Sequence, residues 1–294
     1  HRDLPSFPTR RSSDLSPMYH QIILCRLLDC RNLSKHNPGL PTGFGELMHR
    51  TAQKMLGWII QMTWQDGAVP MVNDSAPGIA PDTRSLLEYA SRLGIQPDHT
   101  IKPGSSGYRM YRNEHLELFV DAGAIGPDYI PGHAHADTLS FLLQVGNKPF
   151  LTETGTSTYE NNAVRWIERS TRSHNTVTCY DRDQSRVWGS HRVARRARAT
   201  ILREDDSSIE ASHDGYRHLG IIHQRSFLLS NNRVIIRDIL HGKGNPTGKA
   251  WFHFAPGISP ELSCRELRTD KACIRINGAD EIVLKTYNFA RGFH

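Results

Sequence analysis

Hydrophobic and polar residues alternate along much of the chain after residue 107. Leu139, Phe141, Leu143 and Val145 occupy every second position, the period of a β-strand with one buried face. Similar short runs, separated by Gly, Asn, Asp and Pro, recur at intervals of roughly ten residues. They predict strands over 108–112, 115–121, 138–145, 149–153, 174–180, 192–202, 207–212, 221–229, 233–240, 249–254, 273–276 and 281–286. Many short strands joined by turns favour an antiparallel sandwich.

The first hundred residues show a helical period instead. Ser16 and Pro17 form a helix-start signal, and apolar residues at helical spacing continue from there to about Asp29. Further apolar stripes predict helices over 44–62 and 83–93. These paired helices are too few to close a domain alone, so we expect them to expose an apolar face. The change from helix to strand is predicted near 96–107.

Composition narrows the class of protein. The chain has 294 residues, a net charge of +6 and 38% hydrophobic residues, and no apolar run approaches the roughly 20 residues needed to cross a bilayer. The positive charge favours an acidic partner, but it is diffuse, and Arg192 to Arg198 is the only dense basic run. No zinc-finger or RNA-binding signature is present, so nucleic acid is not the expected partner. Five scattered cysteines without a C-x-x-C motif indicate incidental thiols.

Residues 1–15 are treated separately. The segment from Ser6 to Leu15 resembles a translated sequencing adapter, so residues 1–15 are excluded from fold reasoning. We therefore expect the chain to be a fragment that lacks its natural N-terminus and is truncated at its C-terminus as well.

The segment Gly132-His133-Ala134-His135-Ala136-Asp137 carries the clearest candidate chemistry. If the strand at 138–145 extends back this far, His133, His135 and Asp137 point to the same side as Leu139. Two imidazoles and a carboxylate at an apolar face each need a partner. Two alternatives satisfy them: a hydrogen-bonded structural cluster, or a metal ligand beside a catalytic imidazole.

Helix pairs followed by a sandwich that contains this segment resemble the heparinase II/III-like polysaccharide lyases, and the similarity covers nearly everything after residue 15. The matching segments are Ser16-Pro17-Met18-Tyr19-His20, Asn73-Asp74-Ser75-Ala76, Gly132 to Asp137, Glu153 to Glu160, Glu168 to Val177 and Val187-Trp188-Gly189. The family joins an (α/α) toroid to an antiparallel β-sandwich, with the active site in the cleft between them. The resemblance therefore implies an α+β multidomain fold, with the last helices of an incomplete toroid at 16–100 and the sandwich at 101–294.

The resemblance also implies cleavage of an acidic, uronate-containing polysaccharide by β-elimination. A base must remove the proton on C5, the resulting anion must be neutralised, and the leaving O4 must be protonated. Tyr19 matches the family's tyrosine, which serves as base, acid or both, although a tyrosine at a helix start is more often simply packed with a wet hydroxyl. His133 matches the histidine across the cleft, which assists proton transfer or neutralises the carboxylate.

By the same resemblance, His135, Glu153 and His174 match a metal site that usually holds Zn²⁺ through His, Asp and His. Two imidazoles and a carboxylate suit a divalent ion. Glu153 replaces the family's Asp and is longer by one methylene, which changes where a metal would lie. The expected role is structural, and Asp137 is expected to orient one histidine.

Five more residues are candidate contacts for the sugar or its carboxylate, and arginine suits planar carboxylate recognition. They are His20, Asn73, Arg169, Arg172 and Trp188.

One departure from the family weakens the expected activity. The family also uses an Asn, or an Asn-His pair, on a toroid helix upstream of the Tyr19 segment, and residues 1–15 cannot supply it. We therefore expect weak activity or none from this fragment. The alternative function is a non-catalytic carbohydrate-binding or assembly protein on the same scaffold. Hydrolysis by paired carboxylates is less favoured. Family members are mostly exported, so a periplasmic or secreted location is expected.

Overall fold

The computed structural model describes residues 16–126 and 131–293, so the adapter-like residues 1–15 lie outside the described residues. Three long helices come first: α2 (Pro17–His36), α3 (Phe44–Met62) and α4 (Thr83–Arg92). Ser16 caps α2 by accepting a hydrogen bond from the Tyr19 backbone N–H, and Asp82 caps α4 in the same way through Ser85. Both predicted helix starts are therefore confirmed, while α2 continues beyond the predicted end at Asp29.

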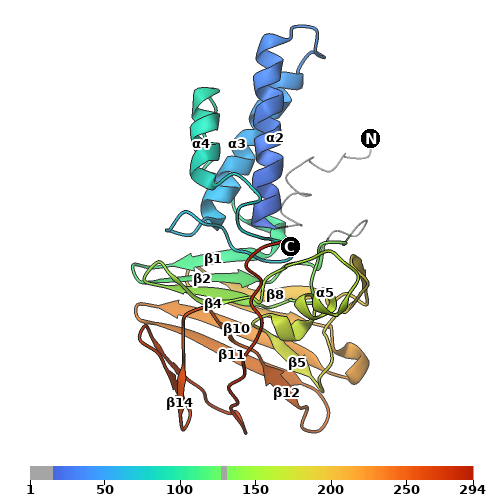
Figure 1. Cartoon of the computed structure of the whole chain (residues 1–294), viewed down its shortest axis with the longest axis vertical. Helices are drawn as coiled ribbons and strands as arrows, with labels where there is room; N and C mark the ends of the chain where they lie inside the picture. The colour runs from blue at the N-terminus through green and yellow to red at the C-terminus, as the bar shows by residue number, and fades with distance from the viewer. Residues whose placement is uncertain (1–15, 127–130, 294) are drawn as a thin grey trace.

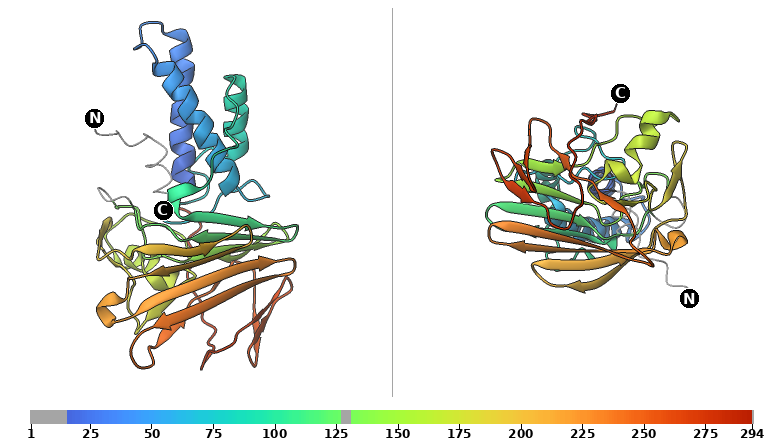
Figure 2. Two further views of the ribbon diagram at one scale, coloured as in Figure 1. Left: turned by 180° about the vertical axis from the view of Figure 1, so that it is seen from behind. Right: turned by 90° about the horizontal axis from the view of Figure 1, so that it is seen from below.

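Two antiparallel sheets follow and face each other, with the helices on one side of the pair (Figures 1 and 2). The first has the strand order β1-β2-β3-β4-β13 and the second β11-β10-β9-β8. The strands of the first sheet are β1 (Tyr108–Arg112), β2 (Leu116–Asp121), β3 (Phe141–Val145), β4 (Pro149–Thr152) and β13 (His253–Phe254). Those of the second are β8 (Ala199–Glu204), β9 (Ser208–His213), β10 (Ile222–Ser230) and β11 (Arg233–His241). The predicted α+β fold with an antiparallel sandwich is confirmed.

Smaller elements surround the two sheets. The strand pairs are β5 (Val177–Cys179) with β12 (Gly248–Ala250) and β6 (Arg186–Trp188) with β7 (Arg192–Ala194), and a third small sheet joins β14 (Glu261–Ser263), β15 (Glu266–Arg268) and β16 (Cys273–Arg275). The helical turns are α5 (Ala163–Glu168), η1 (Gly104–Ser106), η2 (Thr171–Ser173) and η3 (Arg217–Leu219). The pattern analysis missed α5, β6, β14 and β15.

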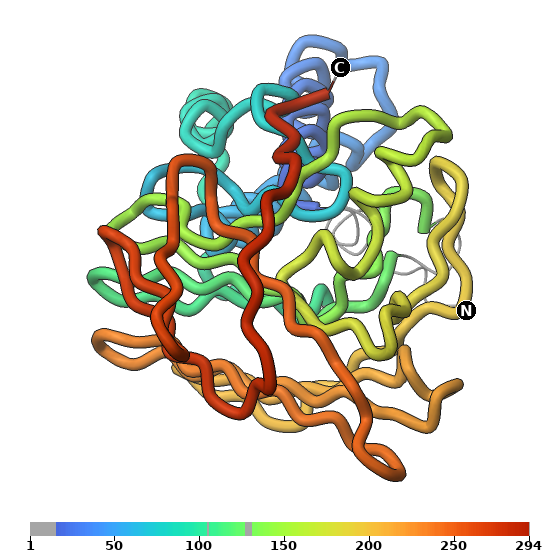
Figure 3. The backbone as a smooth tube through the Cα atoms, turned by 60° about the horizontal axis from the view of Figure 1, so that its bottom comes forward, coloured from blue at the N-terminus to red at the C-terminus, as the bar shows by residue number. Residues whose placement is uncertain are grey.

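The predicted strand over 281–286 is wrong, because that stretch has no strand assignment. Val283 and Leu284 are 56% and 46% exposed. The C-terminal segment instead runs across the sandwich toward the helices (Figures 1 and 3), where the Ala290 N–H donates to the Thr154 carbonyl at 2.8 Å.

The first sheet is buried on both faces. Along β2, Leu118 and Val120 pack into the core shared with the second sheet, which includes Phe227. Phe119 points the other way, into a core shared with the helices, because successive side chains in a strand alternate. The expectation of one buried face on β3 was therefore incomplete, since Leu142 also packs into the helical core. This sheet fixes the helices and the sandwich against each other.

None of the described helices has the combination of length and apolar character that a bilayer-spanning segment needs.

Candidate active site at the junction of the helices and the sandwich

The histidine segment is a loop rather than the start of a strand. Residues 131–140 have no strand assignment, β3 begins at Phe141, and Leu139 adopts a left-handed φ of +61°. The period of two therefore does not extend back from β3. The prediction that His133, His135 and Asp137 share one face is wrong. The His133 side chain is 32% exposed, whereas the other two residues are buried.

Both histidines instead contact one carboxylate. Asp74, from the loop between α3 and α4, is fully buried. Its Oδ2 lies 2.9 Å from His133 Nδ1, and its Oδ1 lies 2.9 Å from His135 Nε2. Arg165, from α5, is also fully buried and donates to both oxygens of Asp74, with Nη2 2.7 Å from Oδ2. We call Asp74, Arg165, His133 and His135 the Asp74 network. It joins the helical region to the sandwich.

The charge state of the Asp74 network follows from these contacts. Burial raises the pKa of Asp74, but hydrogen bonds from His133, His135 and Arg165 outweigh it, so the pKa lies well below its usual range. Burial lowers the pKa of His135 to about 3 despite the neighbouring Asp74. At neutral pH the network therefore holds an ionised aspartate, a cationic arginine and a neutral His135.

Four aromatic side chains meet beside this network. The Tyr19 and Tyr159 hydroxyl oxygens are 2.9 Å apart, and the Tyr19 and His133 ring centroids are 5.0 Å apart. The ring of His191 lies 5.7 Å from that of His133 and 5.4 Å from that of Tyr159. We call Tyr19, His133, Tyr159 and His191 the junction cluster. The structure thus brings the two predicted catalytic residues, Tyr19 and His133, together from opposite sides of the junction.

Burial sets the ionisation of the junction cluster. It raises the pKa of Tyr19, while the hydrogen bond with Tyr159 lowers it. Burial and the bond to Tyr19 raise the pKa of Tyr159, whose ring lies 5.1 Å from the Arg165 guanidinium carbon. Burial and the charge of Arg165 lower the pKa of His191. At neutral pH both phenols are therefore protonated and His191 is neutral.

A second cluster of ligand-type side chains lies deeper in the sandwich. Atoms of Asp137, Glu153 and His174 that could bind a metal lie within 4.8 Å of one another, and all three residues are buried. His174 Nδ1 is 3.0 Å from Glu153 Oε2. His174 Nε2 and Asp137 Oδ2 are buried without a hydrogen-bond partner among the described residues. Such unsatisfied nitrogen and oxygen atoms fit the ligands of a cation held by two carboxylates and an imidazole.

This group differs from the predicted metal set of His135, Glu153 and His174. Asp137 contributes a ligand atom, whereas His135 directs Nε2 to Asp74. The His135 ring remains 5.2 Å from the His174 ring, and its Nδ1 is buried without a hydrogen-bond partner in the described structure. Asp137 therefore lies among the candidate ligands rather than behind a histidine.

Three of the predicted substrate contacts are committed to internal bonds instead. His20 is buried, contacts the Met55 carbonyl at 2.8 Å and stacks on Trp58. Asn73, also buried, accepts a hydrogen bond from the His135 N–H at 3.0 Å through its side chain. Arg169 is 1% exposed and donates to backbone carbonyls, including that of Ala134 at 2.9 Å. These three residues are at most 8% exposed, and the polar side-chain atoms named here bond within the protein.

Arg172 and Trp188 are both exposed, Trp188 by 40%, and the ring of Trp188 lies against the guanidinium of Arg186. Their contact with a substrate stays a prediction.

Sequence reasoning missed four residues of the site. Asp74 and Tyr159 lie within segments that carried the family resemblance, but neither was singled out. Arg165 lies on α5, a one-turn helix with no periodic signal, and His191 lies at the turn between β6 and β7. The only signal for Asp74 and Tyr159 in the sequence was their place in the matching segments Asn73 to Ala76 and Glu153 to Glu160.

The comparisons with known proteins agree with this architecture. The family model described as "Heparinase II/III-like, C-terminal" matches residues 97–289. A solved heparinase III gene product has a TM-score of 0.67 at 18% identity, and covers 86% of this chain and 42% of its own length. The heparan sulfate lyase HepC from Pedobacter heparinus has a TM-score of 0.63 at 18% identity, with 86% and 42% covered. Another heparinase III structure gives 0.64 at 17%, with 87% and 44% covered.

The chain thus spans less than half the length of the solved structures that it resembles. No curated protein matches its sequence. At these identities the structural likeness establishes the fold.

Proposed function

The chain belongs to the heparinase II/III-like C-terminal family, and from this premise we propose that it is part of a polysaccharide lyase that cleaves uronate-containing glycans by β-elimination. One observation carries the proposal. A phenol from the helical region, Tyr19, and an imidazole from the sandwich, His133, have ring centroids 5.0 Å apart. A single sugar ring placed against both would meet two proton-transfer groups.

His133 has the geometry of a proton acceptor. A neutral imidazole that donates its Nδ1 hydrogen to the Asp74 carboxylate, 2.9 Å away, leaves Nε2 free to accept a proton. The same carboxylate stabilises the imidazolium that forms. We therefore assign to His133 the removal of the C5 proton, after which the C5 electron pair forms the C4–C5 double bond.

Tyr19 has the complementary property. Since burial raises the pKa of its phenol, the group is protonated at neutral pH and can donate a proton to O4 as the C4–O4 bond breaks. Tyr159, 2.9 Å away between the hydroxyl oxygens, can stabilise the phenolate by hydrogen bonding. The Arg165 guanidinium lies over the Tyr159 ring, and its charge favours the phenolate form of Tyr19, although the paired Asp74 carboxylate opposes this effect.

We also propose a structural metal site formed by Asp137, Glu153 and His174, with Zn²⁺ as the ion that the family resemblance suggests. A bound divalent cation would offset the mutual repulsion of the two buried carboxylates. It would also hold the loop before β3, the end of β4 and the turn after η2 together. No proton transfer in the proposed reaction passes through it.

The wider assignments rest on the family. We propose that residues 16–100 are the last helices of a toroid domain, that residues 101–294 form the sandwich domain, and that the partner is an acidic polysaccharide. Export to the periplasm or the cell exterior is proposed on the same ground.

The decisive experiment measures lyase activity of the gene product at its natural length. It should be incubated with heparan sulfate, chondroitin sulfate, hyaluronan and alginate, and the ultraviolet absorbance of the unsaturated uronate should rise with at least one of them. Tyr19→Phe should reduce that rate by roughly 10²- to 10⁴-fold, the usual contribution of a positioned acid or base.

Tyr216→Phe is the matched control, because the Tyr216 hydroxyl donates to the Val177 carbonyl at 2.7 Å inside the sandwich. It should leave the rate unchanged. Full activity in Tyr19→Phe, or retention of all four glycans without cleavage, would contradict the lyase assignment. The second result would favour a carbohydrate-binding protein.

A further inference from the structure

A cationic hollow lies on the sandwich beyond the junction cluster. Its lining consists of Arg195, Arg196, Asp214, Gly215, Arg217 and His218. Three arginines therefore face one carboxylate, and that carboxylate is already engaged, because Asp214 Oδ1 accepts the Arg198 N–H at 2.8 Å. Arg195 and Arg217 are exposed, and no carboxylate of the described residues pairs with either guanidinium. We call this site the Arg195–Arg217 hollow.

Strand β7 connects the hollow to the proposed active site. His191, in the junction cluster, immediately precedes β7 (Arg192–Ala194), and Arg195 immediately follows it. Four residues of extended chain span at most about 13 Å. Val193 of β7 and Ala197 pack with Ala134, the neighbour of both loop histidines. The strand that carries the basic run Arg192 to Arg198 is thereby held against the loop that carries His133.

The hollow is also rigid. The Tyr216 side chain is fully buried, and the Arg217 N–H donates to the Asp214 carbonyl at 2.8 Å. A Cβ added at Gly215 would lie 2.5 Å from the Gln184 carbonyl oxygen, so only glycine fits there. Arg195 itself adopts a left-handed φ of +44°, which costs a non-glycine residue roughly 1–2 kcal/mol. These constraints fix the backbone positions from which the Arg195 and Arg217 side chains extend.

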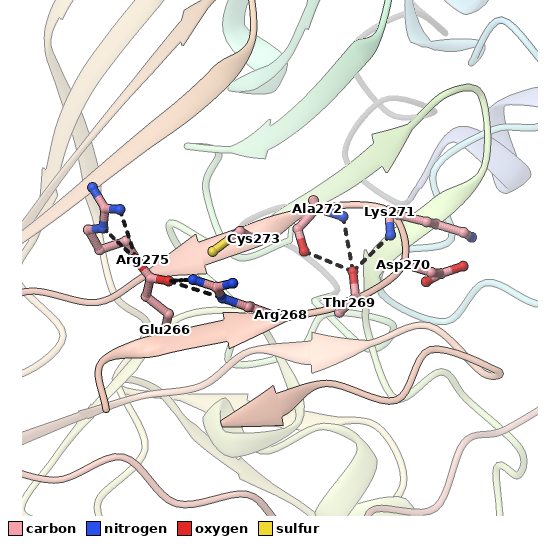
Figure 4. Close-up of a pocket in the computed structure, with 8 residues that line it drawn as sticks. All are labelled: Glu266, Arg268, Thr269, Asp270, Lys271, Ala272, Cys273 and Arg275. Atoms are coloured by element: carbon pink, nitrogen blue, oxygen red, sulfur yellow. Dashed lines mark hydrogen bonds and ion pairs between the residues drawn. The ribbon is translucent and has the colours of Figure 1, made fainter. Parts of the chain in front are cut away.

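The arginines of a second hollow are paired differently. It lies on the sheet of β14, β15 and β16, and Figure 4 shows its lining. There Glu266 pairs with Arg268 and with Arg275, at 2.8 Å each. Its arginines are already neutralised in part, whereas Arg195 and Arg217 have no carboxylate partner among the described residues. Unpaired guanidinium groups in a fixed hollow are suited to a carboxylate or sulfate.

We propose that the Arg195–Arg217 hollow binds an anionic group, carboxylate or sulfate, of the same polysaccharide chain, two or three sugars away from the residue held against Tyr19 and His133. This inference rests on the proposed function for its ligand class. It adds a distal contact that selects long, highly charged chains. Burial and the charges of Arg195 and Arg182 lower the pKa of His218, so the arginines supply the positive charge at neutral pH.

The test compares equilibrium binding by three forms of the gene product at natural length: wild type, Arg195→Gln/Arg217→Gln and the control Arg268→Gln/Arg275→Gln. The control removes the same charge from the other hollow. The ligands are long heparan sulfate, long hyaluronan and a uronate disaccharide. The first double variant should bind long chains about tenfold more weakly at low salt, since each exposed ion pair contributes roughly two- to fivefold. It should bind the disaccharide as wild type does, because a disaccharide in the junction cluster does not reach the hollow.

Loss with heparan sulfate alone assigns the hollow to sulfate, and loss with both polymers assigns it to carboxylate. The proposal is overturned if the control weakens binding equally, if neither polymer responds, or if single-stranded DNA of equal charge competes as well as the polysaccharide. Binding is measured without turnover, so an inactive protein still tests the hollow. Conversely, the Tyr19→Phe experiment leaves the hollow intact, so failure of either proposal is seen separately.

Discussion

Two regions of this molecule contain the same combination of an aspartate, a buried arginine and two histidines, and we propose that the two combinations have different roles. Asp74 and Asp238 each pair with a fully buried arginine and at least one histidine. In the second region, Arg225 Nε and Nη2 lie 2.6 Å and 2.9 Å from the two Asp238 oxygens. His223 Nε2 lies 2.7 Å from Asp238 Oδ1, and His213 lies behind it, with 3.0 Å between the two rings' nearest nitrogens. We call these four residues the Asp238 network.

The difference between the networks is the surroundings of their histidines. His213 and His223 are both at most 1% exposed, and His213 Nδ1 accepts a hydrogen bond from the Gly215 backbone N–H. His133 is a third exposed and lies against the Tyr19 ring. A buried aspartate–arginine pair is therefore a support that the fold uses twice. We propose that proton transfer to a substrate is possible only in the Asp74 network, because there the His133 imidazole reaches the surface beside the Tyr19 phenol.

The largest expected effect comes from removing the charge at the centre of the first network. Asp74→Asn leaves Arg165 buried without its counter-charge, which typically costs about 3–5 kcal/mol of unfolding free energy, and it also releases His133. Urea unfolding and the lyase assay measure the two effects. Asp238→Asn should cost less, because the Asp238 side chain is 25% exposed, and should leave activity intact. Equal loss of activity in both variants would remove the distinction between the networks.

Replacing a histidine in each network should separate activity from stability. His133→Gln should reduce lyase activity by roughly 10²- to 10⁴-fold, because it removes the proposed proton acceptor. Its stability should change by less than about 1 kcal/mol, since the side chain is partly exposed. His223→Gln should do the reverse, with a loss of about 1–3 kcal/mol from unsatisfied buried partners and near-normal activity. An active His133→Gln enzyme would refute the assigned role.

The proposed metal site, which includes His174, lies beside the Asp74 network and would further distinguish it from the Asp238 network. Zn²⁺ at a hundredfold excess over its dissociation constant should stabilise the folded chain by about 2.7 kcal/mol, seen as a higher melting temperature that a chelator reverses. His174→Ala should abolish this response and His223→Gln should keep it. A response of equal size in both variants would show that the ion binds elsewhere.

Lowering the pH should destabilise the folded state through the buried histidines of both networks. We expect this loss of unfolding free energy to be smaller than the effects of the changes above. Burial lowers the pKa of His213 well below its usual value. The folded state therefore holds His213 neutral, while the unfolded state takes up a proton below about pH 6.5. Its contribution is present above that pH and is lost as the pH falls. Between pH 6.5 and 5 the wild type should lose roughly 2 kcal/mol more than His213→Gln.

Chemical denaturation at several pH values measures this difference. The comparison with the variant is needed because burial raises the pKa of Asp121 to about 7, and a raised carboxyl pKa gives the opposite slope. A wild-type curve parallel to that of His213→Gln would contradict the assignment of a neutral buried histidine.

The candidate site was only partly readable from the sequence. The family segments pointed to Tyr19 and His133, and the structure places both at the junction. The same segments also suggested His20 and Arg169, whose side chains turn inward to Met55 and Ala134. A residue type at a matching position gives no information on whether its side chain is already satisfied. That depends on which backbone carbonyls the rest of the fold brings near.

Local signals fixed the elements. A capping serine before a proline, an aspartate before Thr83 and apolar periods of 3.6 and 2 give α2, α4 and most strands of the two sheets, because caps and periodicity act over a few residues. Tertiary structure decided the rest. Asp74, from a loop in the helical region, meets His133 from a loop before β3 and Arg165 from a one-turn helix, at sequence separations of 59 and 91. No local pattern encodes such contacts, since they form only when the first sheet buries one face against the helices and the other against the second sheet.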